Sequence, residues 1–143
     1  GPVKAVNGKI QHLAMEGENP DVASLQMEHE NGVLSNLLAC YCASDELYTF
    51  NVYGTDATAY YNLQEGLRYL PRGQTKLELI QCKKTDTILE ELEEFADSVR
   101  GTQKPEMDGE KSLSSLAVIR AGIKSATEGR RVPIDEVLGS TDE

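Results

Sequence analysis

The sequence predicts an α+β domain: an open-faced, mainly antiparallel sheet of about six strands, with two C-terminal helices packed on one face. Residues 4–82 hold short segments in which apolar and polar residues alternate, and turn residues separate these segments. Residues 86–101 and 108–129 then place apolar residues at helical spacing. Because the strands precede the helices, an antiparallel meander covered on one side is favoured over a parallel sheet.

The first strands are expected over residues 4–14, 21–30 and 33–42. The second of these alternates cleanly, with Ala23, Leu25 and Met27 on one face. Asn31-Gly32 follows it, and an Asn-Gly pair between two alternating segments is the strongest short-range hairpin signal, since both residues of a tight turn need positive φ. We therefore expect a hairpin centred on this pair.

The remaining strands are expected over residues 46–55, 57–63, 66–70 and 75–82. Helices can cover only one face of the sheet, so aromatic residues on the other face need a partner surface, for which tyrosine is well suited. A role for the same rings in the domain's own core is the alternative, because alternation alone does not tell which face the helices cover. The candidate interface residues are Tyr41, Tyr48, Phe50, Val52 and Tyr53.

The first helix is expected to begin after Asp86 and to end at Gly101, because Asp is a favoured N-cap and Gly a favoured C-terminal stop. Its acidic residues, Glu90, Glu91, Glu94 and Asp97, are expected to face water. Its expected buried stripe consists of Ile88, Leu92, Phe95, Ala96 and Val99.

The second helix is expected to begin at Asp108 or Ser112 and to end at Gly129, after which Pro133 prevents its resumption. Its expected buried stripe consists of Leu113, Leu116, Ala117 and Ile123, with Gly122 and Ala126 allowing close packing. Residues 139–143 are expected to form a frayed tail.

Length and charge bound the function. The 143 residues suit a single domain over residues 1–143, and the net charge of −10 argues against nucleic-acid binding. No apolar segment reaches the roughly 18 residues that a membrane-spanning helix needs. We interpret Gly1-Pro2 as the remnant of a cleaved tag, and we therefore expect a longer parent protein.

The residues that could carry chemistry form no recognisable site. The three cysteines, Cys40, Cys42 and Cys82, are expected to be buried thiols in a reducing cytoplasm. His12 and His29 together with them lack the ligand spacing of a zinc finger. The chain has neither a Rossmann glycine fingerprint nor a P-loop, and no nucleophile is placed beside a base. We therefore predict no catalytic, cofactor-binding or metal-binding residue in this chain.

Three segments carry a resemblance to a known family. In chain order they read PDVASLQMEHENGVLSNL, FNVYGTDATAY and EELEEFADSVRGTQKPEMDGEKSLSSLAVIRAGIKSATEGRRVPIDEVL. Together they cover most of the chain from Asp21 to Leu138, and they resemble the C-terminal domain of the Gfo/Idh/MocA family of NAD(P)-dependent oxidoreductases.

The resemblance implies a parent enzyme with an N-terminal Rossmann domain that holds NAD(P) and is missing from this chain. It also implies an open sheet that usually builds a dimer or tetramer, and hydride transfer at a sugar, inositol or related hydroxyl. On that basis the chain is expected to be the substrate-side and oligomerisation domain of a sugar- or polyol-type dehydrogenase, inert by itself. The alternative is a stand-alone assembly or ligand-binding module that uses the same sheet without catalysis.

Two further motifs are assigned structural positions. Lys104-Pro105 imitates the lysine motif of the family, but it falls in the loop between the two late helices, so we expect no catalytic role for it. Arg130 and Arg131 are expected either to contact a neighbouring domain or to complement the dipole of the helix that precedes them.

Overall fold

The computed structural model describes residues 1–139 and divides the chain into two compact units. Unit 1 contains residues 1–43 and the chain from Pro105 onward, and unit 2 contains residues 44–104. Both units carry antiparallel sheets, and helices follow them, so the predicted α+β class is confirmed. The prediction of a single domain stays a prediction. Of the expected tail, residues 140–143 lie outside the described residues.

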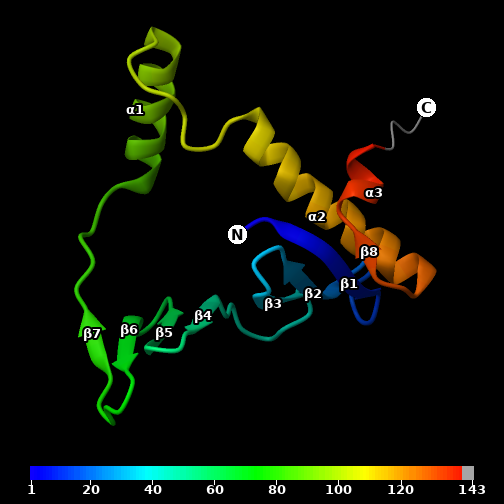
Figure 1. The fold of residues 1–143 in the computed structure, drawn as a ribbon, viewed down its shortest axis with the longest axis horizontal. Helices are drawn as coiled ribbons and strands as arrows, with labels where there is room; N and C mark the ends of the chain where they lie inside the picture. The colour runs from blue at the N-terminus through cyan, green and yellow to red at the C-terminus, as the bar shows by residue number, and fades with distance from the viewer. Residues whose placement is uncertain (140–143) are drawn as a thin grey trace. The chain divides into compact units, whose positions relative to one another are not determined.

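Unit 1 contains the sheet that we call sheet A, with the strand order β3-β2-β1-β8 (Figure 1). Its strands are β1 (Val3–Gln11), β2 (Val22–His29), β3 (Leu34–Cys40) and β8 (Val132–Pro133). The predicted β2–β3 hairpin is present, and its backbone N–H of His29 donates to the carbonyl of Val33 at 2.9 Å. Only Gly32 of the expected Asn-Gly pair has a positive φ, of 81°, because the connection is longer than a two-residue turn.

Unit 2 contains sheet B, whose four strands pair in chain order. They are β4 (Thr49–Tyr53), β5 (Ala57–Asn62), β6 (Gly66–Pro71) and β7 (Glu78–Ile80). In place of one sheet of about six strands, the described chain therefore has two sheets of four. The reason is local: residues 41–48 contain no strand, and β8 adds an unpredicted strand to β1.

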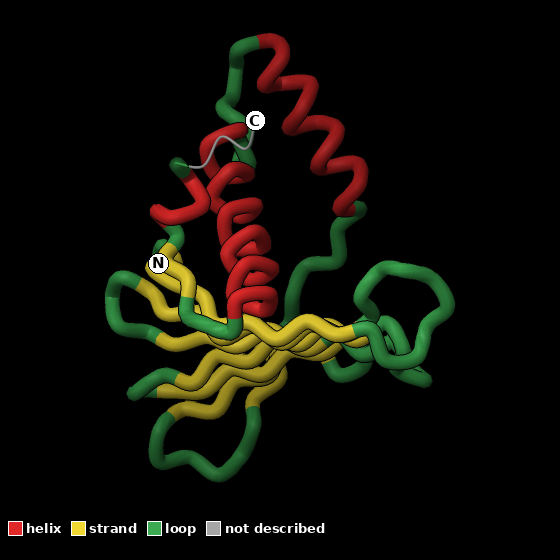
Figure 2. Tube along the Cα trace, turned by 90° about the vertical axis from the view of Figure 1, so that its right-hand side faces the viewer, coloured by secondary structure: helices red, strands yellow, loops and turns green. Residues whose placement is uncertain are grey.

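Helix α2 (Gly109–Glu128) packs on one side of sheet A (Figure 2). Its predicted ends are confirmed: Asp108 accepts a hydrogen bond from the backbone N–H of Lys111 at 2.9 Å, and Gly129 has a φ of 66°. The prediction of its buried face is confirmed for Ala117 and for the close packing of Gly122, and is wrong for the large residues. The buried residues are Ala117, Ala121, Gly122 and Ser125, whereas the expected Leu113, Leu116 and Ile123 are exposed.

Small residues face the sheet because α2 approaches β1 very closely. A Cβ atom added to Gly8 of β1 would lie 2.6 Å from the carbonyl oxygen of Gly122. Ser125 is fully buried, and its Oγ accepts a hydrogen bond from the backbone N–H of Gly8 at 2.8 Å. Larger side chains would hold the two elements apart, so the leucines turn outward.

The chain after α2 adds two elements that the sequence did not predict. Pro133 lies in β8 opposite Ala5, a position that an edge strand tolerates because its N–H is not needed. A short helix, α3 (Asp135–Leu138), follows, so Pro133 does not prevent a further helical turn. These elements complete the core of unit 1, which contains Ala5, Val6, Leu25, Ala117, Ala121, Val132, Ile134 and Val137.

Helix α1 (Thr87–Arg100) has the predicted ends but not the predicted packing. Asp86 caps it through the backbone N–H of Leu89 at 3.1 Å, and Gly101 ends it with a φ of 75°. No residue of α1 is buried, and the large apolar residues of its expected stripe face water. The amphipathic pattern is therefore present without a covering partner in the described part of unit 2. The exposed stripe residues are Ile88, Leu92, Phe95 and Val99.

Candidate functional site

An apolar face of sheet B brings three of the predicted interface residues together. Strand register aligns Phe50 with Tyr61, Leu67 and Ile80 across the four strands, and Val52 with Ala59 and Tyr69. Residues opposite one another in a sheet share a face. The ring of Tyr48 joins this face, since it lies edge-on to the ring of Tyr61 at 6.2 Å. We call this set the apolar face: Tyr48, Phe50, Val52, Ala59, Tyr61, Leu67, Tyr69 and Ile80.

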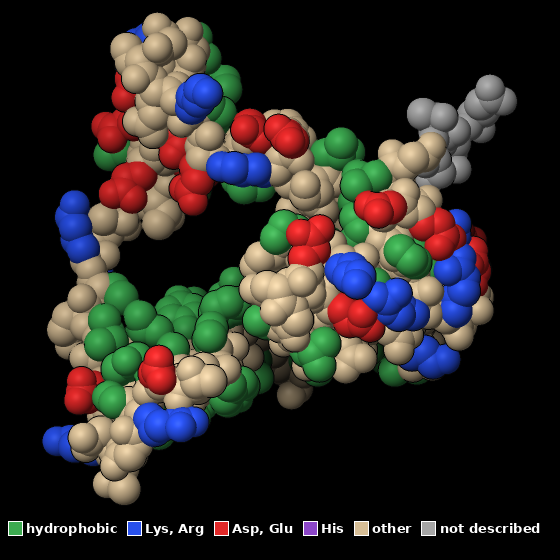
Figure 3. Space-filling view, in the orientation of Figure 1, with side chains coloured by type: hydrophobic (Ala, Val, Ile, Leu, Met, Phe, Trp, Pro, Cys, Tyr) green, Lys and Arg blue, Asp and Glu red, His purple; other side chains and the backbone are tan. Residues whose placement is uncertain are grey.

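The apolar face is open to solvent within its own unit. Phe50 is 64% exposed, Tyr48 59% and Val52 50%. Hydrophobic side chains gather over the strands of unit 2 in the space-filling view (Figure 3). Monomeric soluble proteins rarely expose large contiguous apolar surfaces.

The two other predicted interface residues lie elsewhere. Tyr53 is on the opposite face of β4, where its ring contacts that of Tyr60 at 6.1 Å. Tyr41 belongs to unit 1, in the turn that follows β3, and is 82% exposed. Contact of all five residues with a partner stays a prediction. Tyr61, Leu67 and Tyr69 were not among the predicted interface residues. Their registers with Phe50 and Val52 cannot be obtained from the alternation within single strands.

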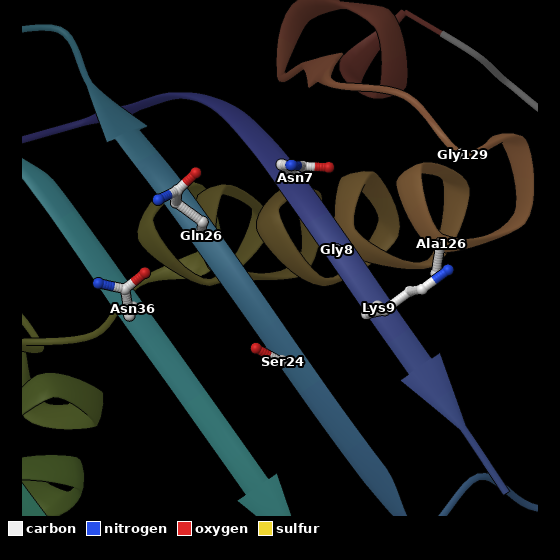
Figure 4. Close-up of a pocket in the computed structure, with 8 residues that line it drawn as sticks. All are labelled: Asn7, Gly8, Lys9, Ser24, Gln26, Asn36, Ala126 and Gly129. Carbon is white, nitrogen blue, oxygen red and sulfur yellow. The ribbon is translucent and has the colours of Figure 1, made fainter.

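A second open surface is the polar face of sheet A, which reaches the end of α2 at Asn7, where the Ser125 hydroxyl donates to Asn7 Oδ1 at 3.4 Å. Asn7, Gln26 and Asn36 lie directly across from one another on β1, β2 and β3, and Lys9 pairs with Ser24 beside them. They line a depression of about 470 Å³, together with Gly8 and with Ala126 and Gly129 at the end of α2 (Figure 4). This site was not predicted from the sequence, because it depends on the register that aligns residues of three strands.

The chemistry of this polar depression is hydrogen bonding. Carboxamides both donate and accept, the Ser24 hydroxyl does the same, and the ammonium group of Lys9 donates. A polyhydroxylated molecule presents the complementary groups. Among the described residues that line the depression, Lys9 is the one charged group, and none is a carboxylate or an imidazole.

The two histidines make local contacts. His12 Nε2 lies 2.5 Å from the carbonyl oxygen of Met15, and His29 contacts the carbonyl of Gly1 and the Ser35 hydroxyl, each at 2.8 Å. Within residues 1–139, no three His, Cys, Asp or Glu side chains gather in a way that suits a metal ion.

The cysteines depart from the prediction of burial. Cys40 and Cys82 are exposed and Cys42 is half-buried. The physical reason is that β3 is an edge strand that ends at Cys40, so the chain leaves the sheet before Cys42. The two sulfur atoms lie 3.3 Å apart.

The two arginines that follow α2 form ion pairs within unit 1. Arg130 binds Glu136 of α3, with an Nη1–Oε2 distance of 3.0 Å, and Arg131 binds Glu28 of β2, with an Nε–Oε1 distance of 2.8 Å. Hydrogen bonds from Arg130 and Lys124 lower the pKa of Glu136 to about 2. Lys104 and Pro105 lie in the exposed loop between α1 and α2, as predicted.

Comparisons with known proteins identify the family of the chain. The model of an oxidoreductase family, described as its C-terminal alpha/beta domain, matches residues 1–134. No curated protein matches the sequence. No helix among residues 1–139 is long and apolar enough to cross a membrane.

Solved structures share the fold. A protein of Desulfitobacterium hafniense, designated an NADPH-dependent oxidoreductase, is 30% identical with a TM-score of 0.89, over 97% of this chain and 44% of its own. An oxidoreductase of Agrobacterium radiobacter, solved with NAD+, L-tartaric acid and magnesium, is 18% identical with a TM-score of 0.80, over 95% of this chain and 44% of its own.

The WlbA dehydrogenase of Bordetella pertussis, solved with NADH and UDP-GlcNAcA, is 21% identical with a TM-score of 0.73, over 93% of this chain and 40% of its own. The chain thus spans less than half the length of these proteins. The two units with their sheets, the helices that follow them and the match over residues 1–134 have one explanation: the chain belongs to the Gfo/Idh/MocA oxidoreductase family, as its C-terminal alpha/beta domain.

Proposed function

We propose that this chain is the substrate-side and oligomerisation domain of an NAD(P)-dependent sugar- or polyol-type dehydrogenase of the cytoplasm. The family match and the dinucleotides bound by two of the similar structures support this assignment. Hydride transfer itself belongs to the whole parent, in which an N-terminal Rossmann domain holds the cofactor. The net charge of −10 supports a domain that binds neither nucleic acid nor anionic membranes.

The cofactor does not fit the described residues of this chain. A dinucleotide site needs a glycine-rich turn between a strand and a helix, so that helix N–H groups reach the pyrophosphate. The connection between β7 and α1, residues 81–86, contains no glycine. The N-termini of α1 and α2 are occupied by the carboxylates of Asp86 and Asp108, which would repel phosphate.

One observation carries the assembly part of the proposal. Among residues 1–139, every buried hydrophobic residue belongs to unit 1, and sheet B and α1 have none. A sheet with an uncovered apolar face is stabilised by another surface. The occupant that we propose for the apolar face is a second copy of the chain. A two-fold axis would bring identical aromatic patches together, and aromatic rings are enriched at such interfaces.

The experiment compares two substitutions on one strand. Phe50→Glu places a charge on the apolar face, and Asn51→Glu places the same charge on the opposite face of β4. Sedimentation equilibrium is expected to show an oligomer for the wild type and for Asn51→Glu, and a weakened oligomer for Phe50→Glu. A folded Phe50→Glu protein that assembles as well as the wild type would show that the apolar face is not the interface between copies.

A second candidate function is a stand-alone module that binds a ligand without catalysis. The polar depression on sheet A favours it, because Asn7, Gln26 and Asn36 offer paired donors and acceptors to a hydroxylated ligand. The mass of the native protein distinguishes the two candidates. A dehydrogenase parent is expected to have about 350 residues or more, from the size of two such domains, whereas a stand-alone module is not.

A further inference from the structure

Cys40 and Cys42 form a thiol pair that the proposed dehydrogenase function does not use. Their sulfur atoms lie 3.3 Å apart, Cys40 is exposed and Cys42 is half-buried. Cys82 is also exposed, but it belongs to unit 2, and its thiol donates to the carbonyl of Ile80 at 3.8 Å. The chain therefore offers one paired dithiol and one single thiol for comparison.

The backbone holds this pair in place. Cys40 is the last residue of β3 and is paired with Val22 of β2. The next backbone N–H, that of Tyr41, donates to the carbonyl of Asp21 at 2.8 Å. The Asp21 carboxylate is itself fixed by three backbone N–H groups. The turn that carries both thiols is thus anchored to the sheet.

The spacing also permits a bond between the two sulfurs. Residues two apart in a chain have Cα atoms within about 7 Å, close to the range that disulfides span. A disulfide has an S–S distance of about 2 Å, so the sulfurs must approach by roughly 1 Å from their contact distance of 3.3 Å. Side-chain rotation supplies a movement of that size.

We infer that Cys40 and Cys42 are a dithiol site that exchanges with small-molecule disulfides such as glutathione disulfide and closes into an intrachain disulfide. In the first step the Cys40 thiolate attacks one sulfur of glutathione disulfide. A Cys40–glutathione bond forms, the glutathione S–S bond breaks, and one glutathione thiolate leaves. In the second step Cys42 loses its proton to solvent and its thiolate attacks the Cys40 sulfur, which releases the second glutathione. Two protein thiols are oxidised and glutathione disulfide is reduced to two glutathione molecules.

The environment assigns the order of these steps. The hydrogen bond with Cys40, partial burial and the negative charges of Cys40 and Asp21 raise the pKa of the Cys42 thiol. Cys42 therefore keeps its proton while Cys40, which is exposed, meets the oxidant. Once Cys40 carries glutathione, the hydrogen bond and the charge from its thiolate are gone, so Cys42 loses its proton more readily and completes the exchange.

The test treats the wild-type chain with glutathione disulfide, blocks the remaining thiols with an alkylating reagent and maps the peptides by mass spectrometry. The expected product has a Cys40–Cys42 disulfide and a single bound glutathione, at Cys82. An excess of reduced glutathione is expected to restore three alkylatable thiols, because a small exposed ring is readily reduced. Near-ultraviolet circular dichroism verifies that each variant is folded.

Two serine variants in a Cys82→Ser background separate the roles. Cys42→Ser is expected to retain one glutathione per chain at Cys40, because no second thiol displaces it. Cys40→Ser is expected to react several-fold more slowly than Cys42→Ser, because Cys42 is half-buried. The inference is overturned if the treated wild type keeps Cys40 and Cys42 alkylatable, if each retains its own glutathione, or if disulfides form only between molecules.

Discussion

At the scale of single residues, Asp21 explains how the long loop after β1 is held. Its carboxylate accepts hydrogen bonds from the backbone N–H groups of Leu13, Ala14 and Met15 at distances of 2.7–2.8 Å. These bonds lower the pKa of Asp21 from an ordinary 3.8 to about 2, because each of them favours the charged form. The residue is only 3% exposed.

Asp21→Asn is expected to lower the free energy of unfolding at neutral pH, because an amide offers one acceptor oxygen and turns an N–H₂ group toward the backbone donors. The folded pKa lies below the unfolded one, so the stabilisation by Asp21 is complete above about pH 4 and is lost as the pH falls through about 2. The difference between the wild type and Asp21→Asn should therefore shrink over this acidic range.

Urea unfolding at a series of pH values measures this difference. Glu18→Gln, in the same exposed loop, is the control and should unfold like the wild type. Equal stability of Asp21→Asn and the wild type at neutral pH would show that the loop is held by other contacts.

Gly8 marks the closest approach between α2 and β1. Gly8→Ala is expected to destabilise the chain by about 1–3 kcal/mol or more, because its Cβ would meet the backbone oxygen of Gly122 at 2.6 Å. Gly122→Ala should cost less, because its Cβ meets the flexible end of Leu25 at 2.8 Å. Gly109→Ala, which has open space around it at the start of α2, should be neutral or slightly stabilising. Thermal unfolding of the three variants checks this order, and a neutral Gly8→Ala would contradict the packing.

At the scale of elements, the ends of the two long helices could be predicted, but of their buried faces only Ala117 and Gly122 of α2 were predicted correctly. Each helix begins at an aspartate cap and ends at a glycine, through hydrogen bonds to residues only a few positions away. The local sequence therefore contains the information that sets these ends, at Asp86 and Gly101 for α1 and at Asp108 and Gly129 for α2. A buried face depends on what lies opposite. The leucines of α2 matched the apolar pattern, but the close approach of Gly8 selected the small residues on another side of the helix.

The same substitution in two elements tests which apolar surface is covered. Leu92→Ala in α1 is expected to change the free energy of unfolding by less than about 0.5 kcal/mol, since Leu92 is 60% exposed. Leu25→Ala in β2 is expected to cost about 2–5 kcal/mol, since Leu25 is 8% exposed and contacts α2. Urea unfolding at a concentration where the chain is monomeric provides the comparison. Equal costs would show that α1 packs within the chain after all.

At the scale of the whole molecule, the order of strands and helices was predictable but the division into two sheets was not. Alternation identified β2 to β6, because each strand carries its own pattern. Whether β3 pairs with β4 depends on the conformation of residues 41–48. The strands expected over 33–42 and 46–55 extended into this segment, which contains no strand in the structure. The prediction of the apolar face was limited in the same way. Alternation within one strand placed Phe50 and Val52 on a common face, but their neighbours Tyr61 and Leu67 could be identified only from the register between strands.

The uneven burial of the two units also has a dynamic consequence. Since all buried hydrophobic residues of the described chain lie in unit 1, sheet B is expected to open more readily than sheet A in the monomer. Amide hydrogen exchange should therefore be faster in β5 than in β1 at low protein concentration. Assembly through the apolar face should slow exchange in β5 as the concentration rises. Exchange in β5 that does not depend on concentration would argue against this face.

The most direct test of the central claim, that this is an assembly domain whose cofactor site lies elsewhere, is sedimentation equilibrium of the wild-type chain with NADH and NADPH titrated into the same sample. We predict a dimer or tetramer that binds neither dinucleotide. A monomer that binds dinucleotide would contradict both parts of the account, because it would place a cofactor site in this chain and leave the apolar face without its proposed partner.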